Sequence, residues 1–180
     1  QIEIILKLKD LLNYNIKRNF LNIKEKYKAY IHAFIHKQKD KIKIIIDFEL
    51  KSLKGLFKNC ISLKEMDFIK FNRKDIIDMS EMFYGCKNLV KLELSRFKTD
   101  DVTNFDSMFY DCSLLEELDL SQLNTSKVTN MQNIFDGCKN LKYLKFDKFN
   151  TNNVITMSDM FNGCCSLKEL NLSNFNTNNV

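Results

Sequence analysis

Apolar residues recur along this chain at a fixed interval of 26 residues. The repeated columns are leucines (Leu89, Leu115, Leu141, Leu167; Leu92, Leu118, Leu144, Leu170), phenylalanines (Phe83, Phe109, Phe135, Phe161), valines (Val102, Val128, Val154, Val180) and cysteines (Cys60, Cys86, Cys112, Cys138, Cys164). A constant period in this range is typical of repeat proteins, in which each repeat is one structural unit that stacks on the next. The sequence therefore predicts a solenoid over residues 42–180.

Within each turn, the leucine motif predicts a short strand. In the third turn Leu118 and Leu120 alternate with a polar residue, as expected of a strand with one buried face. Stacked turns would then form a parallel sheet. The following segment, residues 121–128, predicts a bend whose Asn and Thr columns satisfy backbone groups.

The remainder of each turn predicts a short helix. Phe105, Met108, Phe109 and Cys112 have the i, i+3, i+4, i+7 spacing of one helical face. Favoured N-cap residues come just before this face (Asp78, Asn104, Asn130, Thr156), and residues suited to a left-handed helix end precede each cysteine (Asn59, Gly85, Asp111, Gly137, Gly163). The predicted class is thus α/β, a right-handed solenoid with one short parallel strand and one short helix per turn.

Residues 1–41 predict a separate, basic helical segment. Apolar residues from Ile5 to Phe34 follow steps of three and four, and the segment has ten Lys or Arg against four Asp or Glu. The segment is expected to cap the solenoid or to link it to a missing domain. A membrane surface, a coiled-coil partner and, with less support, nucleic acid stay open as its alternatives. Residues 42–48 alternate in hydrophobicity and predict a strand that forms the first rung of the sheet.

The limits of the chain suggest a fragment. Its 180 residues begin with Gln1 and stop at Val180 inside a repeat, so we expect the solenoid to be incomplete at its C-terminus. No apolar run approaches the ~20 residues of a membrane-spanning helix. A signal-peptide pattern is also absent from the sequence.

The cysteines and histidines do not form a recognisable metal or catalytic motif. One cysteine per 26 residues makes a column, whereas zinc sites use close pairs. Side chains stacked in register point in parallel, so the column predicts buried free thiols, and Cys165 is the candidate reactive thiol. His32 and His36 lie four residues apart without a third ligand. We expect no enzyme activity, no catalytic or metal site and no cofactor.

The strand phase also predicts an exposed face. If the leucines point inward, the residues between them point outward. These residues are Glu65, Asp67, Lys91, Glu93, Glu117, Asp119, Tyr143, Lys145, Glu169 and Asn171. Six acids and two bases make this face a candidate acidic surface for a basic protein partner, with Tyr143 as an aromatic anchor. The alternative is solvated charge that keeps an exposed sheet soluble.

The repeat resembles a known family. Met160-Phe161, Gly163-Cys164 and the residues from Leu167 to Val180 are similar to the 26-residue repeat of BspA-like leucine-rich repeat surface proteins, which is also frequent in mycoplasma-type lipoproteins and in some protist proteins. The resemblance covers about residues 50–180. It implies surface display and adhesion or protein binding, and it supplies no catalytic residue.

The resulting functional expectation is a non-enzymatic module for protein–protein interaction at the cell surface or outside the cell. A cytoplasmic scaffold of a protist or virus is the alternative, and so is attachment to membrane or nucleic acid through residues 1–41. We expect an unidentified protein partner and no small-molecule substrate.

Overall fold

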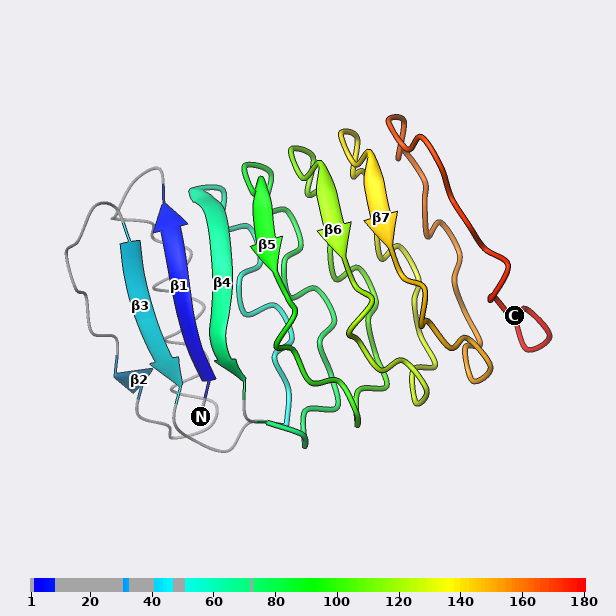
Figure 1. The fold of residues 1–180 in the computed structure, drawn as a ribbon, viewed down its shortest axis with the longest axis horizontal. Coiled ribbons are helices and arrows are strands. Elements are labelled where there is room, and N and C mark those ends of the chain that lie inside the picture. Colours follow the sequence, from blue (N-terminus) through cyan, green and yellow to red (C-terminus); the bar gives the residue numbers. More distant parts are fainter. Residues whose placement is uncertain (1, 9–30, 33–40, 47–50, 72) are drawn as a thin grey trace.

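The computed structural model describes residues 2–8, 31–32, 41–46, 51–71 and 73–180, which form strands and turns (Figure 1). Within these residues there are seven strands and no helix. The strands are β1 (Ile2–Leu8), β2 (Ile31–His32), β3 (Lys41–Ile46), β4 (Leu63–Phe71), β5 (Lys91–Glu93), β6 (Glu117–Asp119) and β7 (Tyr143–Lys145). Figure 1 shows β3, β1, β4, β5, β6 and β7 side by side along the length of the molecule.

The strands belong to two sheets. The first has the order β2-β3-β1-β4-β5 and the second pairs β6 with β7. β1 is antiparallel to both β3 and β4, whereas the strands of the repeats pair in parallel, β4 with β5 and β6 with β7. The expected parallel pairing of the repeats is confirmed for these two pairs. The sheet is interrupted between β5 and β6.

The helix predicted over residues 1–41 is wrong for the parts of this segment that the structure describes, which form β1 and β2. Residues 2–8 form β1, which pairs with β4 from Ile2↔Phe71 to Leu8↔Leu63. The alternation of Ile2, Ile4, Leu6 and Leu8 is a strand signal that the longer helical stripe concealed. The strand predicted at 42–48 is present as β3, but β1 lies between β3 and β4. β3 is therefore not the rung that precedes the first repeat, and the rest of the N-terminal prediction lies outside the described residues.

Residues 51–180 form five stacked turns. One residue of each turn takes part in a continuous series of parallel bridges: Ser52↔Asp78, Asp78↔Asn104, Asn104↔Asn130 and Asn130↔Thr156. The spacing of these bridges equals the sequence period, so each repeat makes one full turn. The repeat register read from the sequence is confirmed by this pairing.

The predicted helix in each turn is wrong, and with it the α/β class. Backbone φ is positive at two positions per turn, which lie four residues apart: Gly55, Glu81, Ser107, Asn133 and Asp159 in one column, and Asn59, Gly85, Asp111, Gly137 and Gly163 in the other. A right-handed helix cannot continue through a left-handed residue. Successive tight turns form instead, such as Met108 N–H to Phe105 C=O and Cys112 N–H to Phe109 C=O.

The residues that suggested helix ends stabilise turns instead. Asp78, Asn104 and Asn130 each accept a hydrogen bond from the amide two residues later, at 2.9 Å. This is an Asx turn, and the same bond geometry makes these residues good N-caps. Glycine at 137 fits a φ of 75° and also a close approach, because an added Cβ would lie 3.3 Å from Asp111 Cα. The left-handed conformation before each cysteine was predicted correctly, but it ends a tight turn.

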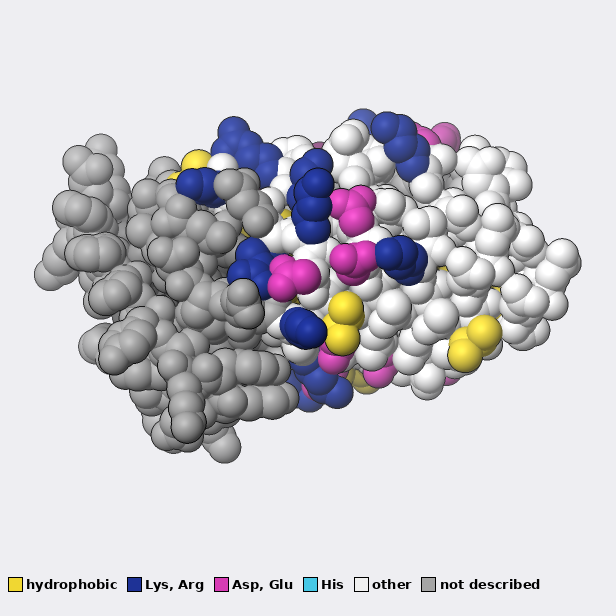
Figure 2. Space-filling view, turned by 90° about the horizontal axis from the view of Figure 1, so that it is seen from below, with side chains coloured by type: hydrophobic (Ala, Val, Ile, Leu, Met, Phe, Trp, Pro, Cys, Tyr) yellow, Lys and Arg dark blue, Asp and Glu magenta, His cyan; other side chains and the backbone are white. Residues whose placement is uncertain are grey.

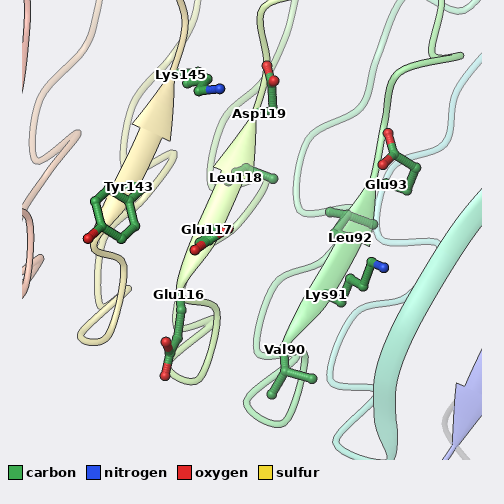
Figure 3. A pocket seen from close by; sticks show the side chains of 10 residues that line it. All are labelled: Val90, Lys91, Leu92, Glu93, Glu116, Glu117, Leu118, Asp119, Tyr143 and Lys145. Carbon is green, nitrogen blue, oxygen red and sulfur yellow. The ribbon is translucent and has the colours of Figure 1, made fainter.

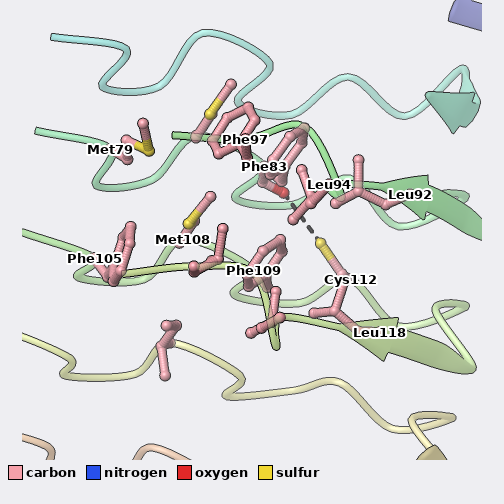
Figure 4. Close-up of a cluster of buried hydrophobic side chains, with 14 of the residues drawn as sticks. Met79, Phe83, Leu92, Leu94, Phe97, Phe105, Met108, Phe109, Cys112 and Leu118 are labelled. Atoms are coloured by element: carbon pink, nitrogen blue, oxygen red, sulfur yellow. Dashed lines mark hydrogen bonds between the residues drawn. The ribbon is translucent and has the colours of Figure 1, made fainter. Parts of the chain in front are cut away.

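The core lies between the strands and the turn segments (Figure 4). Leu118 and Leu120 are buried, with exposed fractions of 3% and 1%, as predicted from the alternation. Phenylalanine rings stack from turn to turn along Phe57, Phe83, Phe109, Phe135 and Phe161, with centroids 5.6–5.8 Å apart. These stacks and the leucine columns bury a continuous apolar core along the turns.

The Asn and Thr columns satisfy backbone groups at the bend, as predicted. The buried Thr125 Oγ1 donates to Asn150 C=O at 3.0 Å and accepts from Asn150 N–H at 2.7 Å. Thr151 makes the same two bonds with Asn176. Each buried threonine therefore links one turn to the next at a place where no strand pairing is available.

Candidate protein-interaction groove

The outward-facing residues predicted from the sequence lie on one face. Glu65 pairs with Lys91 and Asp67 with Glu93 across β4 and β5, while Glu117 pairs with Tyr143 and Asp119 with Lys145 across β6 and β7. All of these side chains are exposed except Glu65, which is half-buried. Glu169 and Asn171 are also exposed and continue the columns one turn beyond β7. The prediction that the strand residues between the leucines point outward is confirmed.

The structure adds a groove that the sequence did not indicate. It has a volume of about 520 Å³ and is lined by Val90, Lys91, Leu92, Glu93, Glu116, Glu117, Leu118, Asp119, Tyr143 and Lys145 (Figure 3). The groove lies where the sheet is interrupted between β5 and β6. In neighbouring turns, hydrogen bonds join the backbone just before and just after adjacent strands. The equivalent bonds here would run from Glu116 N–H to Val90 C=O and from Leu94 N–H to Asp119 C=O, and neither is present.

The groove combines apolar and acidic groups. Leu92 and Leu118 are buried, and the side chain of Val90 is exposed beside them. Four acids and two bases are among its lining residues. Such a site suits the side chain of a lysine or arginine, whose apolar stem packs on aliphatic groups while its charge faces carboxylates.

Two of the acids also hold the local backbone. Asp119 Oδ1 accepts from the hydroxyl and the amide of Ser121 at 2.6 and 2.9 Å, and these bonds hold the pKa of Asp119 below its ordinary value. Glu93 Oε1 accepts from Ser95 N–H at 2.9 Å. Asp119 and Glu93 in the acidic strip therefore also stabilise the turns that follow their strands.

Glu117 is the acid most available for binding. Glu116 forms an ion pair with Lys142 at 2.7 Å. Glu117 is exposed, and no hydrogen bond or ion pair involves its side chain among the described residues. Its carboxylate is therefore available to form an ion pair with a basic group in the groove.

Tyr143 forms one side of the groove and has a partner in the next turn. Its side chain is 49% exposed. Lys168 Nζ donates to the Tyr143 hydroxyl at 3.0 Å and lies 5.1 Å from the ring centroid, and this hydrogen bond raises the pKa of Lys168. The contact holds the ring at the edge of the groove, and the role of Tyr143 as an aromatic anchor stays a prediction.

Charges on other faces are mostly interleaved. Figure 2 shows basic and acidic side chains next to one another over the middle of one face, with few charged side chains towards the C-terminal turns. Lys127 pairs with Asp101 at 2.5 Å and Lys87 with Asp111 at 3.0 Å. Pairing of this kind leaves little net field for a charged partner, which distinguishes these faces from the groove.

Val90 and Glu116 are groove residues that sequence reasoning missed. Each stands just before a repeat strand, in a column whose other members are Lys64, Lys142 and Lys168. The mixture of residue types in this column carries no repeat signal. Only the interrupted pairing of β5 and β6 shows that the two side chains line one space.

The prediction of buried free thiols is confirmed at four of the five column positions, while the reactivity of Cys165 stays a prediction. All six cysteines are free; four of the column are buried, Cys164 is half-buried and Cys165 is exposed. No group of three or more potential metal ligands occurs in the described part of the chain. The side chain of His32 and all of His36 lie outside that part, so the prediction for this pair stays a prediction.

Comparison with family models identifies the repeats. The family described as "Mycoplasma protein of unknown function, DUF285" matches residues 51–143 and 115–180. The chain belongs to this family. The two DUF285 matches together cover the five stacked turns and begin where those turns begin. They agree with the mycoplasma-type part of the resemblance, whereas the likeness to BspA-like leucine-rich repeat proteins stays a prediction.

The other comparisons add no relative to the DUF285 assignment. Neither the curated proteins nor the solved structures give a match to this chain. Among the residues that the structure describes, no helix has the length and hydropathy needed to cross a lipid bilayer.

Proposed function

We propose that this DUF285 chain is a non-enzymatic interaction module that binds a basic, extended segment of a protein partner in the groove over β5, β6 and β7. The observation that carries the proposal is the exposed, unpaired carboxylate of Glu117 above the buried leucines of the groove. A stack of repeats supplies an extended surface on which such a site can form without disturbing the core.

The proposed ligand follows from the shape and charge of the groove. Carboxylates of Glu93, Glu117 and Asp119 favour a lysine or arginine, and Leu92 and Leu118 offer apolar contact to its stem. The amides of Leu94, just after β5, and Glu116, just before β6, lack the acceptors found in neighbouring turns, so they can bond to carbonyls of a ligand in an extended conformation. The attraction would depend on salt, since exposed charges are screened within ~10 Å at 0.1 M.

The test measures binding of a short fluorescent peptide of alternating lysine and threonine, with a glutamate–threonine peptide as the ligand control. Glu117→Lys should weaken binding of the basic peptide at low salt by about tenfold or more, the loss expected for one charge-assisted contact. The matched control is Glu169→Lys, which makes the same charge change in the same column but outside the groove. Equal loss in both variants, or no loss in either, would reject the groove as the binding site.

We further propose that the module is displayed on the cell surface and acts in adhesion. The proposal is supported by the description of the family as a Mycoplasma protein family and by the resemblance noted in the repeats. Protease treatment of intact cells tests it. Loss of the protein from intact cells, with a cytoplasmic control protein retained, is the expected result, and protection of the protein until lysis would contradict it.

A further inference from the structure

The two ends of the groove differ in chemistry. Figure 3 shows Val90 and Glu116 at the end where the strands begin. The carboxylate of Glu116 is paired with Lys142 there, at 2.7 Å, so this end carries little net charge. The opposite end holds two acids and one base, which are Glu93, Asp119 and Lys145. The groove is therefore acidic at one end only.

Exposed apolar side chains gather at the end where the strands begin. Val90 is 44% exposed, and Tyr143, the first residue of β7, is 49% exposed. Leu114 is 41% exposed and lies near the same end. The hydrogen bond from Ser113 Oγ to Lys87 C=O places the next residue, Leu114, beside position 88, two residues before Val90. Val90, Leu114 and the Tyr143 ring together form the apolar end of the groove.

The two aliphatic residues of the apolar end do not belong to the repeat pattern. The other members of the Val90 column are Lys64, Glu116, Lys142 and Lys168, and those of the Leu114 column are Ser62, Asn88, Asn140 and Ser166. All of these are charged or polar. The stacking of the turns thus needs no apolar side chain at either position. Two exposed aliphatic groups at one end of a groove are typical of a contact with a ligand.

The position of these groups relative to Glu117 sets the spacing of a ligand. Leu114 lies three residues before Glu117, and the equivalent of Val90 in that turn lies one residue before it. The midpoint between the two aliphatic groups is therefore two residues from Glu117. In an extended ligand, side chains two residues apart point to the same face, whereas adjacent side chains point to opposite faces.

We infer that the groove selects an extended segment with a bulky apolar side chain two residues away from a lysine or arginine. The basic side chain faces Glu117, and the apolar side chain packs on Val90 and Leu114 beside the Tyr143 ring. This selectivity rests on the proposed binding of a basic segment in the groove. Charge attracts basic segments of any sequence, whereas the apolar end distinguishes one basic segment from another.

The experiment compares the binding of two fluorescent peptides of identical composition to the full chain. One peptide is leucine–threonine–lysine–threonine–leucine and the other is threonine–leucine–lysine–leucine–threonine, both with blocked ends. In the first peptide the leucines share a face with the lysine, whichever direction the peptide takes in the groove. It should bind about tenfold more tightly than the second, the gain expected for burying one leucine side chain.

The variant Leu114→Ser tests the apolar end. The same column has serine at Ser62 and Ser166, so this substitution is compatible with the fold. The preference for the first peptide should fall to about threefold or less, because one side of the apolar end is lost. The matched control is Ile155→Ser, which removes a 64% exposed isoleucine outside the groove and should leave the preference unchanged.

Equal binding of the two peptides, with both weakened by Glu117→Lys, would overturn this inference and leave the proposed groove binding intact. If Glu117→Lys weakens neither peptide, the groove binding itself fails. A preference that persists in Leu114→Ser, or that Ile155→Ser also removes, would assign the selectivity to another surface. A doubled mass in solution that Leu114→Ser abolishes would overturn the inference by showing that a second copy of the chain covers the apolar end.

Discussion

The Sγ of Cys112 donates a hydrogen bond to the backbone carbonyl oxygen of Phe83, 3.2 Å away in the preceding turn (Figure 4). The same bond recurs at Cys86 and Cys138, with distances of 3.1 Å. These thiols are buried, and each links two neighbouring turns as a donor. Deprotonation of such a thiol would remove the hydrogen bond and leave an unsolvated negative charge in the core.

The first prediction concerns stability at alkaline pH. Burial raises the pKa of the Cys86, Cys112 and Cys138 thiols above the ordinary value of 9.0. The folded chain keeps these protons after the unfolded chain has lost them, so the free energy of unfolding should fall as the pH rises above about 9. Each thiol should contribute a slope of up to about 1.4 kcal/mol per pH unit.

Urea unfolding of the native protein and of Cys112→Ala between about pH 8 and pH 10 checks this slope. The variant will be less stable at every pH because it loses a buried group. Its stability should nevertheless fall less steeply with pH, by about the contribution of one thiol. Identical slopes in the two proteins would show that Cys112 does not stay protonated in the fold.

The second prediction concerns the order of thiol modification. Cys165 is exposed, while half-burial raises the pKa of Cys164 to about 11. Since the thiolate is the reactive form, Cys165 should be labelled first by a maleimide, Cys164 second and the buried column last. Mass mapping of labelled peptides over time gives the order. Early labelling of Cys86 or a Cys86–Cys112 disulfide would contradict the buried, free column.

Residue alternation predicted more of this molecule than helical spacing did. The inward phase of Leu118 and the outward phase of Glu117 followed from a strand, where successive side chains must point to opposite faces. The spacing of Phe105, Met108, Phe109 and Cys112 fits a helix and a series of tight turns equally well. The left-handed backbone at Ser107 decides between them, and serine carries no signal for that conformation.

The N-terminal segment shows how context overrides a pattern. Residues 2–8 fit a helical stripe when they are read with the residues that follow, yet they pair with both β3 and β4. Pairing partners far along the chain are invisible to a local period. The groove was equally hidden, because the sequence shows the acidic residues but not the interruption of the sheet between β5 and β6.

The third prediction tests the strand phase through the core. Leu118→Ala should lower the free energy of unfolding by about 2–5 kcal/mol, because it leaves a cavity between buried leucines. Glu117→Ala, on the same strand but facing outward, should change it by less than about 0.5 kcal/mol. Chemical denaturation of both variants is the measurement. Equal effects would mean that the strand does not bury one face.

The fourth prediction concerns the threonine column. Thr125→Val keeps the shape of the side chain but leaves Asn150 N–H and C=O without the hydroxyl that bonds both. Because Thr125 is buried, the loss should be about 1–3 kcal/mol. Thr103→Val is the matched control, since its hydroxyl donates to Ile77 C=O at an exposed position. A similar loss in both variants would assign the effect to the substitution rather than to the buried bonds.

The groove as the partner-binding site is tested most directly by an amide NMR titration of the full chain with the lysine–threonine peptide. Shift changes should centre on residues 90–93, 116–119 and 143–145, which line the groove, and should shrink as salt is raised to about 0.5 M. Changes centred on the turn segments around residues 79–85 and 105–111, or spread evenly over the chain, would contradict the proposal that this face binds the partner.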